Sequence, residues 1–255
     1  MKYNKLEQYK DDKFRRITGI KRETFENMTE ILKEAEALRR AKGGPKPLLI
    51  VEDMLLATLE YLREYRTYAH IAPSYGLSES QIYRIVKWVE DILIKSGKFR
   101  LPSKGALLTG EIEIETKDVT ECPIERPKKK HIRDKHWSAK KRRYTQKGLV
   151  VVDKLRNQII CTTFGKGRTH DFRVYKESGI HISPETLGLT DSGFVGIVKL
   201  HPNSLLPLKG SKNRPLSKQD KYYNRVIAML RTSNEHVFSR LKKFRIVAER
   251  YRNRR

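Results

Sequence analysis

The spacing of apolar residues changes near residue 105, and this change restricts the folds open to the chain. In residues 1–42 and 51–93, apolar residues recur at helical spacing. From residue 105 onward, short apolar runs are separated by turn-forming residues, which is typical of strands. The sequence therefore predicts a mixed α/β protein whose N-terminal part is entirely helical.

Residues 1–42 are predicted to be helical, with Thr18 or Thr24 able to cap a helix start. Residues 43–47 then interrupt the pattern, because their glycines and prolines disfavour a helix interior. We therefore place a first helical region at residues 1–44.

Residues 51–93 have the pattern of a helix-turn-helix. A short middle helix is predicted at residues 68–75, and Gly76 suits the tight turn after it because a positive φ costs glycine little. Ser78 and Gln81 form a capping box at the start of the third helix. The outward face of that helix could meet DNA through Ser80, Gln81, Tyr83, Arg84 and Lys87. The alternative is a plain helical hairpin, and either would occupy a region at residues 45–97.

The second part of the chain, residues 105–255, is predicted to build one sheet with helices around it. Strands are expected at residues 106–109, 111–116, 148–153, 158–164 and 186–190, with residues 154–157 closing a hairpin. Helices are expected at residues 169–178 and 220–249.

Positive charge is concentrated in this second part. The chain has 55 Lys+Arg against 30 Asp+Glu, and residues 101–255 carry a net charge of +20 while residues 1–100 carry +5. Residues 126–147 alone contain eleven Lys or Arg and one Asp. Such density predicts a polyanionic partner, with nucleic acid favoured. If that partner is double-stranded DNA, we expect the residues that hold it to include Arg126, Lys128, Lys129, Lys130, Lys140, Lys141, Arg142, Arg143, Arg231 and Lys242. The alternative is a solvated basic tail or a localisation signal.

Other protein classes are disfavoured by what the sequence lacks. It has no apolar run long enough for a membrane span and no apolar stretch near its start that resembles a secretory signal. Its two cysteines form no CxxC pair and cannot supply a disulfide framework. We therefore expect a cytoplasmic protein with no membrane partner.

Three acids are candidates for metal chemistry. Asp118 follows a predicted strand, Asp191 ends another, and Glu235 lies on the last helix off its apolar face. Three such oxygen ligands would suit one or two magnesium ions and metal-assisted attack on a phosphodiester. Each acid also has a structural interpretation, because the aspartates could cap turns and Glu235 could pair with Arg231.

Five segments around these acids resemble those of a bacterial DDE transposase of the insertion-sequence-five family. They are DVTECPIERPKKK, KKRRYTQKGLVVVD, GKGRTHDFRVYKES, TDSGFVG and RTSNEHVFSRLKKFRIVAERYRNRR, in the expected order. Residues 47–93 are similar to the helix-turn-helix that precedes the DDE superfamily endonuclease domain. The resemblance implies an RNase-H-like catalytic domain, a mixed five-stranded sheet flanked by helices.

The resemblance also assigns residues to the site. It implies that Asp118, Asp191 and Glu235 are catalytic and ligate Mg²⁺ or Mn²⁺, with two ions expected. His170 and Asp171, in the third segment, receive a supporting role. Because members of this family usually continue past the last segment with another helix, we expect residues 105–255 to be a C-terminally truncated domain.

These observations predict a prokaryotic, nucleoid-associated transposase. It would bind terminal inverted repeats as a homo-oligomer, hydrolyse a phosphodiester at each element end and transfer the exposed 3′-hydroxyl to target DNA. One rival is an inactive or truncated transposase-derived DNA-binding protein, which would gain nothing from converging acids. The other is an RNA-processing nuclease with the same metal chemistry.

Overall fold

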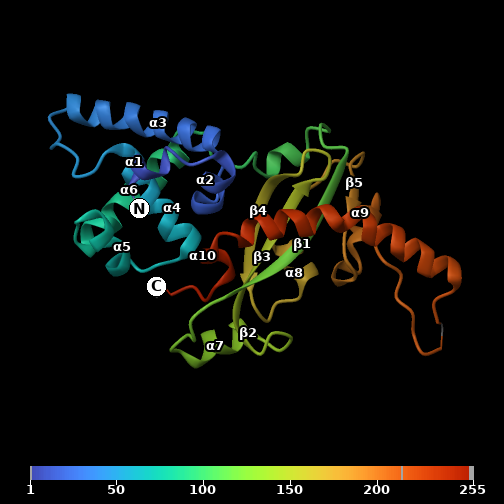
Figure 1. Ribbon diagram of the computed structural model, residues 1–255. Helices are drawn as coiled ribbons and strands as arrows, with labels where there is room; N and C mark the ends of the chain where they lie inside the picture. The colour runs from blue at the N-terminus through green and yellow to red at the C-terminus, as the bar shows by residue number, and fades with distance from the viewer. Residues whose placement is uncertain (1, 214, 253–255) are drawn as a thin grey trace. The chain divides into compact units, whose positions relative to one another are not determined.

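Two compact units make up the chain in the computed structural model, which describes residues 2–213 and 215–252. The first unit comprises Met1–Arg100 with Lys242–Glu249, and the second comprises Leu101–Leu241 with Arg250–Arg255. The first is helical and the second contains a mixed sheet with helices, which confirms the predicted fold class (Figure 1). The domain limits at residues 44, 97 and 105 stay predictions.

Three helices, not one, occupy the first 42 residues. They are α1 (Tyr3–Leu6), α2 (Asp11–Thr18) and α3 (Arg22–Ala41). The prediction of continuous helix was wrong because Gly19 adopts a left-handed φ of 84°, which ends α2. Neither threonine caps a helix start: α3 follows Lys21, and the Thr18 hydroxyl donates to the Phe14 carbonyl within α2.

The helix-turn-helix prediction is confirmed in detail. Helix α4 (Val51–Glu64) is followed by α5 (Tyr68–Tyr75) and α6 (Glu79–Lys95), with Gly76 at φ 69° between the last two. Ser78 Oγ accepts from the Gln81 N–H, and Gln81 Oε1 accepts from the Ser78 N–H, which completes the capping box. The inner face of α6 buries Ile82, Val86 and Val89.

Removing this cap should loosen the start of α6. We expect Ser78→Ala to destabilise the helical unit by about 1 kcal/mol, because one helical N–H loses its acceptor. Hydrogen exchange of the first-turn amides of α6 checks this, with Ser74→Ala at an exposed position as the control. Equal exchange in the two variants would show that the cap contributes nothing.

The sheet of the second unit is mixed. Its strands are β1 (Ile114–Pro123), β2 (Trp137–Ser138), β3 (Arg143–Asp153), β4 (Gln158–Lys166), β5 (Leu187–Leu189) and β6 (Ser204–Leu205). They run in the order β2-β3-β1-β5-β6, with β4 also paired to β3. β3 is antiparallel to β1 and β4, whereas β5 is parallel to β1 and β6.

Several predicted boundaries were wrong in this unit. Residues 106–109 do not form a strand, because Lys104–Leu107 form the short 3-10 helix η1 instead. The strands β1 and β3 extend further than predicted because they pair with each other from Glu115↔Asp153 to Pro123↔Thr145. The predicted helix at residues 220–249 is broken into α9 (Lys218–Lys242) and α10 (Arg245–Ala248).

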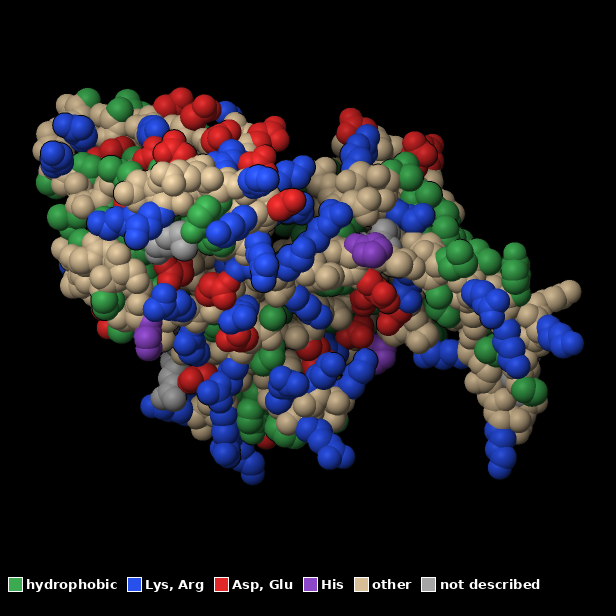
Figure 2. All heavy atoms as spheres, in the orientation of Figure 1, with side chains coloured by type: hydrophobic (Ala, Val, Ile, Leu, Met, Phe, Trp, Pro, Cys, Tyr) green, Lys and Arg blue, Asp and Glu red, His purple; other side chains and the backbone are tan. Residues whose placement is uncertain are grey.

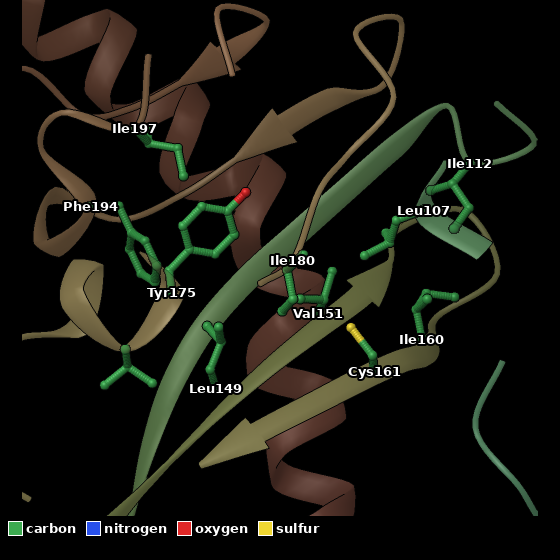
Figure 3. Packing of buried hydrophobic residues seen from close by; sticks show 11 residues of the cluster. Leu107, Ile112, Leu149, Val151, Ile160, Cys161, Tyr175, Ile180, Phe194 and Ile197 are labelled. Carbon is green, nitrogen blue, oxygen red and sulfur yellow. The ribbon is translucent and has the colours of Figure 1, made fainter. Parts of the chain in front are cut away.

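Both faces of the sheet are covered. One face carries the larger apolar core, where α8 (Asp171–Glu177), η1 and the short helices η2 (Ser192–Phe194) and η3 (Ile197–Lys199) pack (Figure 3). On the other face, Val237 and Phe238 of α9 pack against Val150 and Val152 (Figure 1 shows this helix in red). The short helix α7 (Lys130–His136) lies within the basic stretch of residues 126–147.

Among the described residues, none of the helices has both the length and the apolar character that a membrane crossing requires.

Candidate active site

Asp118 lies within β1, where the parallel pairing with β5 ends. The last paired residues are Thr116 and Leu189, so the register carried two residues further brings Asp118 beside Asp191. The sequence predicted Asp118 to follow its strand, but β1 continues to Pro123 because β3 pairs with it that far. The fold thus brings two of the three predicted acids together where the pairing of β1 with β5 ends.

The acids near Asp118 affect the protonation of its carboxyl group. Burial raises the pKa of the Asp118 carboxyl above its ordinary value, and the negative charges of Asp191 and Asp171 raise it further. The Val119 N–H and the positive charge of Arg231 lower that pKa, but the net shift is upward. A cation placed among these acids would relieve their mutual repulsion.

Asp118, Asp191 and the neighbouring Asp171 each have one carboxylate oxygen that accepts a hydrogen bond. Asp118 Oδ1 accepts from the Val119 N–H at 2.7 Å, Asp191 Oδ1 from the Gly193 N–H at 2.8 Å, and Asp171 Oδ1 from Lys147 Nζ at 2.7 Å. The other oxygen of each, Oδ2, accepts no hydrogen bond from the described residues. Each carboxylate is therefore oriented while keeping an oxygen available.

Gly193 allows two of these carboxylates to lie close together. A β-carbon at this position would lie 2.9 Å from Asp191 Oδ1 and 3.3 Å from Asp171 Oδ2. Lys147 Nζ fixes the second of these acids and also donates to the Thr169 carbonyl at 2.7 Å. The pairing of Lys147 with Asp171 was missed from sequence, where the lysine counted only as part of the basic block.

The donor chemistry fits a divalent metal ion. Carboxylate oxygens are the ligands that Mg²⁺ prefers, and the pKa of Asp118 is raised mainly by burial, with a further contribution from the charges of Asp191 and Asp171. Within the described part of the chain, however, no group of three or more His, Cys, Asp or Glu side chains is arranged to hold a metal ion. The role of Asp118 and Asp191 as metal ligands therefore stays a prediction.

Glu235 is exposed on α9, and no contact joins it to the two aspartates in the described structure. One turn earlier, Arg231 Nη2 lies 3.9 Å from Asp118 Oδ2, so this face of α9 is turned toward the site. Arg231 Nε is buried and has no hydrogen-bond partner among the described residues. The role of Glu235 as third ligand stays a prediction, as does DNA contact by Arg231. His170 is exposed at the N-cap of α8.

Sequence reasoning missed a buried ion pair next to the site. Glu115 and Lys117, both fully buried, pair on the opposite face of β1 from Asp118, and Lys117 Nζ also lies 5.4 Å from the centre of the Tyr175 ring. Burial raises the pKa of Glu115, and Lys117 lowers it in part. Glu115 and Lys117 are two residues apart in a strand and so share one face, but nothing in the sequence indicated that this face is buried.

The predicted DNA-reading face of α6 is largely accessible. Ser80, Tyr83 and Arg84 are exposed. Gln81 is partly occupied, because its Oε1 accepts the Ser78 N–H in the capping box. Lys87 lies 3.5 Å from Glu90 on the same helix.

The basic candidates of the second unit lie on its surface. Exposed side chains include all eight predicted between residues 126 and 143, namely Arg126, Lys128, Lys129, Lys130, Lys140, Lys141, Arg142 and Arg143. In Figure 2, Lys and Arg side chains gather over the part of this unit where Figure 1 places α7 and β2. Lys242, which ends α9 and is the first residue of the C-terminal segment assigned to the first unit, is also exposed.

Comparison with known proteins adds two family matches. Residues 117–255 match the family described as DDE superfamily endonuclease, and residues 47–99 match the family described as helix-turn-helix of DDE superfamily endonuclease. The chain is 44% identical over 256 residues to a protein of Microchaete diplosiphon named as a transposase for insertion sequence element IS702, covering 100% of this chain and 92% of that protein. A Streptomyces albus G protein, named as a transposase for insertion sequence element IS112, is 25% identical over 237 residues, covering 91% and 84%.

Proposed function

Because this chain belongs to the DDE superfamily endonucleases and is an insertion-sequence transposase with a preceding helix-turn-helix, we propose that it acts on the ends of its own element. It binds the terminal inverted repeats and hydrolyses one phosphodiester at each end, which exposes a 3′-hydroxyl. The same site then directs that hydroxyl at a phosphodiester of target DNA. The proximity of Asp118 to Asp191 is the observation that carries this proposal.

Enzymes of this superfamily depend on divalent metal, which when bound activates the attacking oxygen and stabilises the leaving one. We propose Mg²⁺, or Mn²⁺, as two ions held by Asp118, Asp191 and Glu235. Each aspartate accepts a backbone N–H on Oδ1, and its Oδ2 would be the oxygen that holds an ion. In this site Lys147 and Asp171 support the geometry from the α8 side.

The cations of the chain would hold the DNA that the acids repel. Arg231 Nε, which is buried without a partner in the described structure, would donate to a phosphate near the site. On α6, Ser80, Tyr83 and Arg84 would read base edges, and their exposure supports this role. Because both element ends must be cut together, we propose that the protein acts at least as a dimer.

Joining of element ends to a target plasmid in Mg²⁺ tests this function. We expect wild-type protein to join a duplex ending in an inverted repeat to the plasmid, and Glu235→Gln to lose joining by about 100-fold or more while it still binds the duplex. Glu113→Gln, at an exposed acid of the same unit, is the matched control. Binding without cutting by wild-type protein would favour the inactive DNA-binding alternative, and equal joining by both variants would remove Glu235 from the site.

A further inference from the structure

The connection between β1 and β3 forms a basic arm, which we define as residues 124–143. It contains α7 and β2. Ten of its residues are Lys or Arg and one, Asp134, is a carboxylic acid, apart from Glu125 at its base. The cationic side chains are mostly exposed, and Figure 2 shows Lys and Arg side chains gathered over this part of the unit, so the arm offers a surface suited to phosphates.

An aromatic pair lies within this positive surface. Trp137 is 41% exposed, and its ring packs edge-on against Tyr144 with the ring centres 5.2 Å apart. The two residues are also cross-strand partners of β2 and β3. Trp137 belongs to neither apolar core of the unit, so much of its ring stays open to a ligand.

The backbone around Trp137 is fixed. His136 Nδ1 lies 3.1 Å from the Thr145 carbonyl, and the Arg168 N–H donates to the Lys135 carbonyl at 3.1 Å. Beyond the tryptophan, Ser138 Oγ accepts from the Lys141 N–H at 3.3 Å. These bonds hold the chain on both sides of Trp137, and the ring itself packs on Tyr144, which lowers the entropy lost when a flat ligand binds.

The arm lies within reach of DNA bound at the aspartates. Asp118 pairs with Val150 of β3, and Tyr144 lies six residues before Val150 on the same strand. At about 3.4 Å per residue, this places the aromatic pair about 20 Å along the strand from Asp118. A DNA strand rises about 3.4 Å per nucleotide, so the distance corresponds to about six nucleotides.

An exposed aromatic ring such as that of Trp137 distinguishes single-stranded from double-stranded DNA. Cations bind the phosphates of a duplex and of a single strand alike, but an aromatic face stacks on a base only when that base is out of the duplex stack. We propose that Trp137 and the basic arm bind an unpaired stretch of DNA, with a base stacked on the Trp137 ring. This inference rests on the proposed function, because it takes the unpaired stretch to flank the cut made at Asp118 and Asp191.

Tryptophan fluorescence can test the site without cleavage. The chain has two tryptophans, so Trp88→Phe leaves Trp137 as the sole reporter. Without metal, a single-stranded oligonucleotide of about 16 nucleotides should quench this fluorescence, and a blunt duplex of the same length should quench it much less. Equal quenching by the single strand and the duplex would overturn the proposal, because it would indicate phosphate binding alone. The absence of quenching by either form of DNA would overturn it as well.

Variants separate stacking from charge. We expect Trp137→Ala to weaken single-strand binding by about 5- to 100-fold and duplex binding by less than about 2-fold, with Trp137→Phe retaining most of the affinity. Lys129→Ala, as the matched charge control, should weaken both forms similarly. If Trp137→Ala lost equal affinity for single-stranded and duplex DNA, this would contradict stacking. Fluorescence quenching that rises with protein concentration in the absence of DNA would contradict it too, because it would indicate that a second copy of the protein covers the ring.

The outcome is distinct from that of the joining assay. If Trp137 responds to single strands while the wild-type protein never cuts DNA, the proposed function fails and the single-strand site remains. If the protein joins ends normally while Trp137→Ala binds single strands as well as wild type, the function stands and this inference fails.

Discussion

Asp191→Asn should lower the nicking of supercoiled plasmid in Mg²⁺ by about 1,000-fold or more, and DNA binding should persist. The substitution removes a negative charge proposed to hold a metal ion, and loss of such a ligand costs several kcal/mol of transition-state stabilisation. The amide oxygen can still accept the Gly193 N–H that Asp191 Oδ1 accepts, so the local turn is retained. A plasmid-relaxation time course measures the rate directly.

Two further measurements make this result decisive. Glu113→Gln, at an exposed acid of the same unit, should nick at the wild-type rate. A gel shift with an inverted-repeat duplex should give similar affinity for Asp191→Asn and wild type, because the variant removes a repelling charge and no cation. Nicking by Asp191→Asn at the wild-type rate would exclude Asp191 from the mechanism.

Lys117→Met should destabilise the sheet unit by about 3–5 kcal/mol. The substitution leaves Glu115 fully buried and without the lysine that now pairs with it. Urea unfolding followed at the sheet core measures the loss, and Lys166→Met at an exposed position of β4 should change stability by less than about 0.5 kcal/mol. A loss no larger than that of the control would show that the ion pair contributes little.

The pH dependence of Lys117→Met has a defined sign. Burial raises the pKa of Glu115 in the folded protein, and removing Lys117 removes the group that lowers it. A folded-state pKa above the unfolded value gives stability that is present at low pH and is lost as pH rises through the folded value. We therefore expect the deficit to be smaller in acid than at neutral pH. The double variant Glu115→Leu/Lys117→Met should recover much of the stability, because neither charge is then buried.

Local signals made parts of the fold predictable from sequence. Gly76 and the Ser78–Gln81 capping box act within a few residues, and the middle helix was predicted to the residue. Gly19 carried a local signal as well, but the surrounding helical pattern concealed it. The limits of β1 and β3 could not be read locally, because each strand extends only as far as the other pairs with it.

The site was predictable to a smaller extent, because its geometry depends on contacts between distant residues. The parallel register of β1 and β5 brings Asp118 to Asp191. Their positions at predicted strand ends and the family resemblance both indicated that they would meet, but the sequence did not give the register that does it. The contact between Lys147 and Asp171 spans 24 residues and left no pattern in the sequence. The third carboxylate, Glu235, is still a prediction that the joining assay must decide.

The route of the chain near its C-terminus has a practical consequence. Residues 242–249 belong to the helical unit, where α10 packs on α4 and Arg245 Nη1 lies 3.5 Å from Glu64 Oε2. The chain then returns to the sheet unit, where the Tyr251 N–H donates to the Pro123 carbonyl. A protease that nicks the connection at residues 97–104 would therefore leave both fragments attached under native conditions. An isolated recombinant fragment that ends at residue 100 would lack part of its own packing surface and is the wrong reagent for measuring repeat recognition.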